Sequence, residues 1–234
     1  MRDPLMIPYK GEILVVATDN SGGIGMKEQD NVHVPYKIVG YFGFRVAVME
    51  CIAARAHPFS VILHNFCGEE HWNALVEGIQ QGMMELGLDI PISGSTETNM
   101  NMVQSAVGLN VLGMAEKNTE RSFQEDCLAV IGIPLVGDEV LYNREYVAPL
   151  SLFSWFSKQS DVTILPVGSK GIFHEIKNLF PEAKAEQMAT NVDLYASAGP
   201  ATCFLISYPK VMESDIIENA GQHFHKIRQK HSQG

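Results

Sequence analysis

The sequence predicts an α/β protein made of two units of similar size. In its first half, short β-branched apolar runs alternate with segments whose apolar residues recur at helical spacing, in the order strand, helix, strand, helix, strand. A polar segment, residues 115–126, interrupts this pattern, and a second alternation follows it. The 234 residues suffice for one large domain or two small ones. We therefore expect one domain over residues 1–120 and a second over residues 121–234.

The first half opens with a strand at residues 12–19, EILVVATD, because the β-branched run stops at the turn-forming sequence DNSGGIG. Residues 34–58 are predicted to form a long helix, since Val39, Phe42 and Val46 recur at helical spacing and Pro58 ends the pattern. The elements expected next are a strand at 59–66, an amphipathic helix at 68–88 and a strand at 103–114.

The second half resumes with an apolar strand at residues 127–137. The elements expected after it are a strand at 162–168, a helix at 170–180, a strand at 201–209 and a terminal helix at 214–230 with Ser214 as its cap. In that terminal helix His223 and His225 would point to different faces, so metal binding by this pair is not expected.

The formal net charge of -10 leaves no broad basic face, which argues against nucleic acid or an anionic membrane as the main partner. No stretch approaches the length of about 18 apolar residues that a membrane helix needs. The four cysteines are far apart and form no CxxC pair, as is usual for reduced thiols. We expect a soluble, cytoplasmic protein that can bind phosphate compounds through a divalent cation.

Three carboxylates, Asp19, Glu50 and Glu97, come from separate elements, and each lies near a turn of small residues. Hard cations such as Mg²⁺ take oxygen ligands, usually one or two carboxylates together with substrate phosphates. These acids are therefore candidate metal ligands, although a lone acid at the end of an element is more often a cap or a solvated residue. The SGGIG sequence matches neither GxxxxGK[ST] nor GxGxxG, so it is either a simple turn or a loop that covers phosphates.

Several motifs, in a consistent order, resemble the superfamily of aminoimidazole ribonucleotide synthetase, thiamine-monophosphate kinase, selenophosphate synthetase and a hydrogenase maturation protein. The motifs are VVATDNSGGIG, the helix and strand VGYFGFRVAVMECIAARAHPFSVIL, and ISGSTET, followed by LVGDEVL, VGSKGIFHEI and SAGPATCFLIS. The resemblance covers most of the chain at low identity. It implies a two-domain α/β fold, with an N-terminal domain that binds ATP and Mg²⁺ and forms a homodimer, and a smaller C-terminal domain.

Within this superfamily, the stretch from ATDNSGGIG to ISGSTET is most similar to the α-ribazole kinases, which phosphorylate the 5'-hydroxyl of a riboside used in cobamide (vitamin B12) assembly. The resemblance implies Asp19 and Glu97 as catalytic residues and Asp19, Glu50 and Glu97 as metal ligands. It implies a nucleotide site of Asn20, Gly22, Gly23, Lys27, Ser95 and Thr96, and a riboside site of Asn65, Asn99, Phe42 and Phe66.

Two departures from the family pattern leave alternatives open. Ser95 stands where one alignment expects an aspartate, whereas a shifted alignment places Glu97 and Thr98 on the family's acidic pair. This favours, as an alternative, a regulatory protein that binds nucleotide without turnover. Gly199, Pro200 and Ala201 stand in place of the acidic GED sequence of the thiamine-phosphate branch, which argues against that acceptor. A thiamine-phosphate kinase, or a synthetase-type relative with another small acceptor, remains a further alternative.

Overall fold

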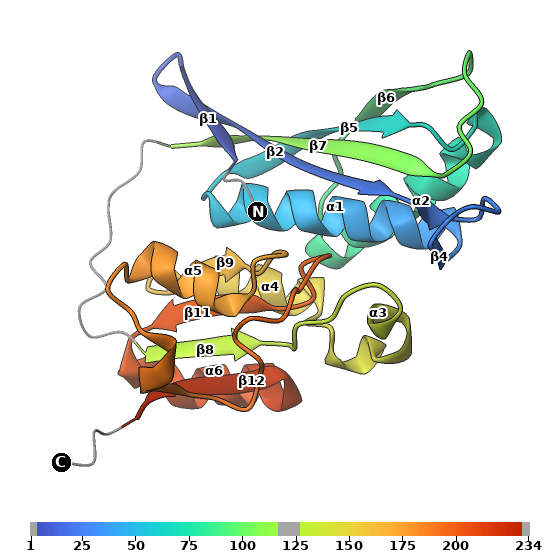
Figure 1. Cartoon of the computed structure of the whole chain (residues 1–234). Coiled ribbons are helices and arrows are strands. Elements are labelled where there is room, and N and C mark those ends of the chain that lie inside the picture. The colour runs from blue at the N-terminus through green and yellow to red at the C-terminus, as the bar shows by residue number, and fades with distance from the viewer. Residues whose placement is uncertain (1–3, 117–126, 231–234) are drawn as a thin grey trace. The chain divides into compact units, whose positions relative to one another are not determined.

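The computed structural model describes residues 4–116 and 127–230. The described residues fall into two compact units, one within residues 2–119 and the other within residues 120–234 (Figure 1). The predicted boundary at residues 120 and 121 lies outside the described residues. Each unit has its own sheet and its own helices, so each is described by itself.

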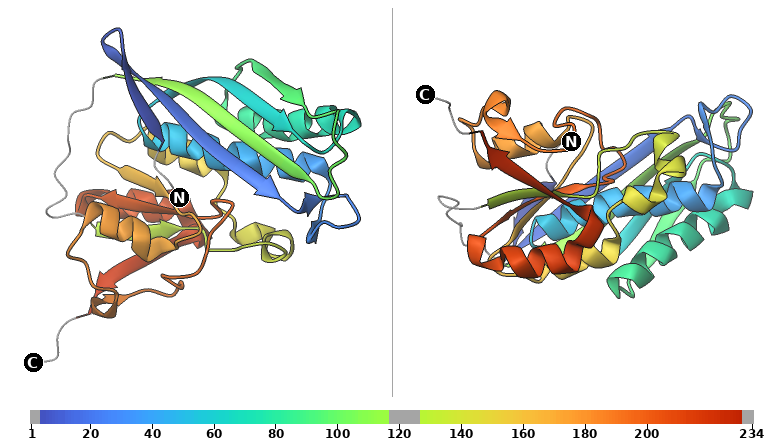
Figure 2. Two further views of the ribbon diagram at one scale, coloured as in Figure 1. Left: turned by 45° about the horizontal axis from the view of Figure 1, so that its top comes forward. Right: turned by 90° about the horizontal axis from the view of Figure 1, so that it is seen from below.

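A five-stranded sheet organises the first unit. Its strands, in spatial order, are β1 (Leu5–Tyr9), β2 (Glu12–Gly22), β7 (Ala106–Ala115), β5 (His57–Asn65) and β6 (Ile92–Thr96). β5 and β6 are parallel, and the other three neighbouring pairs are antiparallel. The helices α1 (Tyr36–Ala53) and α2 (Trp72–Leu86) both lie on one side of this sheet (Figures 1 and 2). Three short elements complete the unit: β3 (Ile24–Gly25), β4 (Val32–His33) and the 3₁₀ turn Glu69–His71.

The alternation of side chains along the strands decides which residues face the helices. Val15 and Ala17 of β2 are buried, and Leu109 and Val111 of the neighbouring β7 are buried with them. Side chains two residues apart on a strand share a face. Asp19 follows Ala17 by two residues, so it lies on the face that the helices cover.

The two helices of this unit approach each other closely at two glycines. A Cβ on Gly40 of α1 would overlap the carbonyl oxygen of Leu75, and a Cβ on Gly78 of α2 would overlap the carbonyl oxygen of Lys37. The backbones of α1 and α2 are therefore in direct contact, with no layer of side chains between them at this point.

The second unit is also a five-stranded sheet with helices. In spatial order its strands are β10 (Met188–Ala189), β12 (Phe224–Gln229), β8 (Cys127–Ile131), β11 (Phe204–Tyr208) and β9 (Thr163–Pro166), all paired antiparallel. Its helices are α3 (Glu139–Tyr142), α4 (Leu150–Ser157), α5 (Ile172–Leu179) and α6 (Glu213–Ala220), with 3₁₀ turns at Arg144–Tyr146, Ala185–Gln187, Lys210–Met212 and Gly221–His223. Val130, Leu205, Ile172 and Ile176 are fully buried where α5 packs on the sheet.

Three sequence-based expectations differ from this structure. The terminal helix ends at Ala220, and the chain continues as β12 beside β8, because Gly221 has a φ of +52° and breaks the helix. Ser214 is not its cap, since α6 already begins at Glu213. The strand expected over residues 127–137 ends at Ile131, where Gly132 adopts a φ of +82°.

Among the described residues no helix is both long enough and apolar enough to cross a membrane.

Candidate functional site

Asp19 is a partly buried acid on the helix-facing side of the first sheet. It pairs with Leu109 across β2 and β7, and a Cβ on Gly43 of α1 would lie 3.8 Å from its Oδ2 atom. Burial raises the pKa of Asp19 to about 7, and the hydrogen bond from the Asn20 amide opposes this shift only in part. A bound cation would offset the cost of ionising this carboxyl.

Glu50 lies on the same side of α1 as Gly43 but farther along the helix. The two positions are seven residues apart, which is two helical turns and a rise of about 10 Å. A Cβ on Gly43 would lie close to Asp19, so Glu50 is two helical turns from a position of α1 that faces this carboxyl.

Glu97 follows the last residue of β6 and shapes the turn after it. Its Oε1 atom accepts hydrogen bonds from the amides of Asn99, at 2.6 Å, and Met100, at 3.0 Å. β6 and β2 are separated by two other strands, so their axes lie about 14 Å apart at about 4.8 Å per strand. The residue of β6 level with Asp19 is Gly94, and Glu97 comes three residues after it.

The three predicted metal ligands are therefore not gathered around one point. Among the described residues no group of three or more His, Cys, Asp or Glu side chains could hold a metal ion together. The assignment of Asp19, Glu50 and Glu97 as metal ligands stays a prediction, and in this structure they do not form such a group. The physical reason is that a sheet of this order places β2 and β6 far apart, although both strands end at polar turns.

Lys27 is directed at backbone carbonyl groups rather than at the acids. Its Nζ atom donates to the carbonyl oxygens of Met102, at 2.8 Å, Phe66, at 3.2 Å, and Gln104, at 3.5 Å. The predicted glycine loop around it begins inside the sheet, since Gly22 is the last residue of β2, and Gly23 follows with a φ of +68°. In this structure Lys27 ties that loop to the segments after β5 and before β7.

Asn65 is buried and holds a turn together. Its Nδ2 atom donates to the carbonyl of Gly68, at 2.8 Å, and to Oγ1 of Thr96, at 3.2 Å, while its Oδ1 atom accepts from the Cys67 amide, at 2.8 Å. With an exposed fraction of 0%, Asn65 has no surface for a substrate in this structure. The Thr96 hydroxyl, on the adjacent strand β6, accepts one of these hydrogen bonds from Asn65.

The first five residues of the ISGSTET motif form strand β6, and Glu97 and Thr98 follow it. A Cβ on Gly94 would overlap the carbonyl oxygen of Leu63 on β5, so only glycine fits between these two strands. Ser95 comes next and is exposed.

The other predicted binding residues lie on separate parts of the unit. Phe42 on α1 packs edge-on against Tyr41, with ring centroids 5.1 Å apart, and Phe66 after β5 is 37% exposed. Asn20 on β2 and Asn99 beside Glu97 are exposed. The amide of Asn99 donates to Glu97, whereas the ring of Phe42 contacts its neighbour on α1.

Sequence reasoning missed a buried acid, Asp30, and its partner Ser105. Asp30 is 6% exposed, and its two carboxylate oxygens accept hydrogen bonds from the amide and the hydroxyl of Ser105, each at 2.7 Å. The two residues are 75 positions apart. No local spacing in a single sequence signals such a contact.

This unit also carries an apolar groove of about 500 Å³ between α2 and the edge of β6. Its lining consists of Trp72, Val76, Gln80, Met83, Met84, Leu88, Asp89, Ile90 and Ile92. None of the three acids or of the predicted riboside-binding residues lines it.

No protein family model and no curated protein matches the chain. Solved structures do match it over nearly its whole length. Thiamine monophosphate kinase from Aquifex aeolicus shares 12% identity, with 98% of this chain and 88% of that chain covered and a TM-score of 0.60. A second structure of that kind, AaThiL complexed with AMPPCP and TMP, shares 13% identity over 97% of this chain and 84% of that chain, with a TM-score of 0.59. The hydrogenase maturation protein HypE in complex with ATP shares 11% identity over 92% and 76% of the two chains, with a TM-score of 0.59.

These similarities define the fold. The chain has the α/β fold of the aminoimidazole ribonucleotide synthetase-like proteins, so the predicted fold class is confirmed. The structures with this fold include a thiamine monophosphate kinase and HypE.

Proposed function

We propose that the protein is an ATP- and Mg²⁺-dependent kinase that phosphorylates the 5'-hydroxyl of a small riboside, with α-ribazole as the substrate and α-ribazole 5'-phosphate as the product. The observation that carries this proposal is Asp19, a partly buried carboxyl with a raised pKa on the sheet of the first unit. The shared fold supports it, because similar structures contain AMPPCP or ATP. The choice of α-ribazole follows from the sequence resemblance alone.

Asp19 suits one magnesium ion. Mg²⁺ is usually held by one or two carboxylates, several waters and the oxygens of the substrate phosphates. Asp19 would supply the carboxylate, while the segment after it, with Asn20, Gly22 and Gly23, would lie near the phosphates. When bound, Mg²⁺ supplies charge neutralisation for the transferring phosphoryl group. Because the acids are far apart, Glu50 and Glu97 would act at other points of the site or not at all.

The riboside would lie at the exposed end of β6. Ser95, Asn99 and Glu97 offer one hydroxyl, one amide and one carboxylate there, and the half-exposed ring of Phe66 follows the neighbouring strand β5. A hydroxyl, an amide and a carboxylate suit ribose hydroxyl groups, and an aromatic ring suits a planar base.

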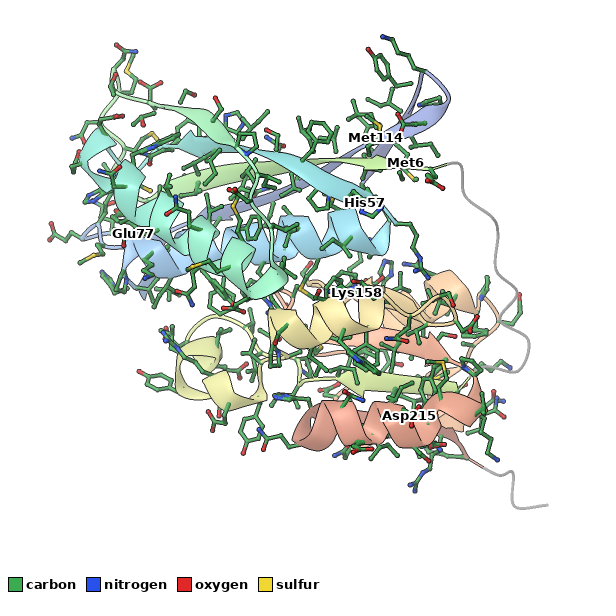
Figure 3. The ribbon with its side chains drawn as sticks, turned by 180° about the vertical axis from the view of Figure 1, so that it is seen from behind. Met6, His57, Glu77, Met114, Lys158 and Asp215 are labelled. Carbon is green, nitrogen blue, oxygen red and sulfur yellow. The ribbon has the colours of Figure 1, made fainter. Side chains whose placement is uncertain are left out.

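We also propose that the protein forms a homodimer through the sheet of the first unit. Leu5 and Ile7 of β1 are exposed, and strand pairing places them beside Val16 and Leu14 of β2 on the face opposite the buried Val15. On β7, Met114 and Leu112 pair with Leu14 and Val16 and continue this region, and Figure 3 labels Met114 beside its register partner His57 of β5. An apolar sheet face of this kind is typical of a surface that packs against another sheet.

Two measurements on the purified protein test the kinase proposal. Titration calorimetry with Mg-ATP should show binding by the wild type and at least about tenfold weaker binding by Asp19→Ala. Equal binding by both proteins would remove Asp19 from the site. Mass spectrometry after incubation with ATP and α-ribazole should show the riboside gaining one phosphoryl group.

The same assay separates the alternatives. A regulatory protein would bind Mg-ATP and leave α-ribazole unchanged, and the dispersed acids among the described residues are the observation that favours this reading. Thiamine monophosphate serves as the competing acceptor. If it is phosphorylated and α-ribazole is not, the acceptor assignment is wrong and the kinase assignment stands.

A further inference from the structure

A buried carboxylate, that of Asp30, attaches the chain segment that follows Asp19 to the residue before β7. This segment, residues 23–34, is called the Asp30 loop below. Asp30 accepts hydrogen bonds from the Lys27 amide, at 2.9 Å, from the Ser105 amide, at 2.7 Å, and from the Ser105 hydroxyl, at 2.7 Å. The carbonyl of Lys27 in turn accepts from the Asp30 amide, at 3.0 Å, which closes the turn.

Asp30 is ionised in this setting. Burial alone would raise its pKa, but the hydrogen bonds from Ser105 and the Lys27 amide, together with the nearby His33, hold the pKa below its ordinary value. Hydrogen bonds to a charged acceptor are about twice as strong as neutral ones. The contact between Asp30 and Ser105 is therefore a strong attachment of the loop to the start of β7.

The attachment is packed tightly on its other side. The Ser105 hydroxyl also shares a hydrogen bond of 2.8 Å with the Tyr36 hydroxyl, at the first residue of α1. A Cβ on Gly25 would lie 2.7 Å from the Tyr36 ring and would overlap the Ser105 hydroxyl. Gly25 therefore leaves the room that this contact needs.

Two further side chains extend the attachment to neighbouring segments. Lys27 reaches the carbonyls of Phe66 and Met102, as described above. The Nε2 atom of Gln104 donates to the carbonyl of Gln29, at 2.6 Å, and to Oδ1 of Asn31, at 3.1 Å. The loop after Asp19 is thus fixed to the segment that follows Glu97, so one network joins two edges of the proposed site.

We propose that Asp30 and Ser105 form a latch that holds the Asp30 loop in the conformation that binds magnesium-bound ATP, which makes both of them positioning residues. This inference rests on the proposed function, because it requires ATP to bind beside Asp19. A loop that is already ordered loses less conformational entropy on binding. Opening the latch therefore weakens ATP binding, even when the protein stays folded.

The central variant is Asp30→Asn, which keeps the shape of the side chain. An amide nitrogen in place of Oδ2 cannot accept the bonds from the Lys27 amide and the Ser105 hydroxyl. In the ligand-free protein, the amides of Lys27 and Ser105 should exchange with deuterium faster than in the wild type. In calorimetry, the dissociation constant for Mg-ATP should rise at least about tenfold at a temperature where thermal scans show both proteins folded.

A double-mutant cycle tests whether the two residues act as one unit. Ser105→Ala should also weaken ATP binding, and Asp30→Asn/Ser105→Ala should be no weaker than Asp30→Asn alone, because both changes remove the same contact. In turnover, KM for ATP should rise about tenfold with kcat changed less than about twofold, as for the loss of ground-state binding. If Asp30→Asn does not fold, Ser105→Ala carries the test by itself.

Asp193→Asn is the matched control. Asp193 is an exposed aspartate whose Oδ1 atom accepts from the Tyr195 amide at 2.8 Å, so the same chemical change is made at an ordinary turn. Its ATP affinity should equal that of the wild type.

Two results would overturn the latch. One is faster exchange at Lys27 and Ser105 with unchanged ATP affinity, and the other is unchanged exchange in Asp30→Asn. A wild-type protein that binds no Mg-ATP would instead refute the proposed function, and the inference with it.

Discussion

The raised pKa of Asp19 makes a prediction about stability that requires no ligand. A carboxyl whose pKa is higher in the folded state binds its proton more tightly there than in the unfolded chain. The stability that this provides is complete below the ordinary pKa of 3.8 and is lost as the pH rises through about 7. Above that pH, the folded protein must hold an ionised and partly buried carboxylate. Asp19→Asn removes this cost, so we expect the variant to be more stable than the wild type at high pH.

The size of the effect follows from the shift. From 3.8 to about 7 is about three pKa units, and at 1.36 kcal/mol per unit this corresponds to about 4 kcal/mol. Because Asp19 is partly exposed, solvent screening reduces the expected gain to about 2 to 4 kcal/mol at pH 8. At pH 4, where Asp19 carries its proton in the folded state, the difference between the two proteins should be at least about 2 kcal/mol smaller.

The assay is urea unfolding at pH 4, 6 and 8, followed by tryptophan fluorescence. The chain has two tryptophans, Trp72 in the first unit and Trp155 in the second, so a Trp155→Phe background reports on the first unit alone. The quantity compared is the difference in unfolding free energy between the Asp19→Asn variant and the protein that keeps Asp19, at each pH. A difference that stays constant from pH 4 to pH 8 would show that Asp19 titrates normally and would refute the argument.

Two further predictions concern packing. Gly40→Ala should lower the free energy of unfolding of the first unit by at least about 2 kcal/mol in urea titrations, because the added methyl meets the Leu75 carbonyl. Gly43→Ala in the same helix should be neutral or stabilising by up to about 1 kcal/mol, since its methyl has ordinary contact distances, and equal losses for both would contradict this account. Ile7→Glu should convert a dimer of the wild type into monomers in light scattering, because it places a charge on the exposed apolar sheet face. A wild-type protein that is already monomeric would refute the proposed interface.

Local patterns predicted β2, α1, β5, α2 and β7 of the first unit, but neither β1 nor β6. The β-branched run before Asp19 forms β2, and the helical spacing of Val39 and Val46 is that of α1. These signals are local, because strand and helix periodicity depend on near neighbours in the sequence. The end of the chain was predicted wrongly because its structure depends on residues that are distant in the sequence. Its apolar residues fit a helix, but pairing of Phe224 and Ile227 with β8, about a hundred residues away in the sequence, selects a strand.

The site was harder to predict than the fold. Asp19 could be selected because the sequence predicts a strand that ends there. The strand in fact runs on to Gly22, and the structure gives Asp19 a raised pKa. The distance between Asp19 and Glu97 depends on strand order, which the sequence of either motif does not contain. The burial of Asn65 and the contact of Asp30 with Ser105 likewise depend on residues that meet only after folding.

The contact of α1 with α2 at Gly40 and Gly78 bears on how this unit can respond to a ligand. Where side chains separate two helices, they can absorb a small displacement by changing rotamers. At Gly40 and Gly78 no side chain lies between the two backbones. A displacement of α1 at this contact would therefore push directly on the backbone of α2. The wall of the apolar groove on the far side of α2 shifts with it, so an environment-sensitive dye attached in that groove would report events at the acid.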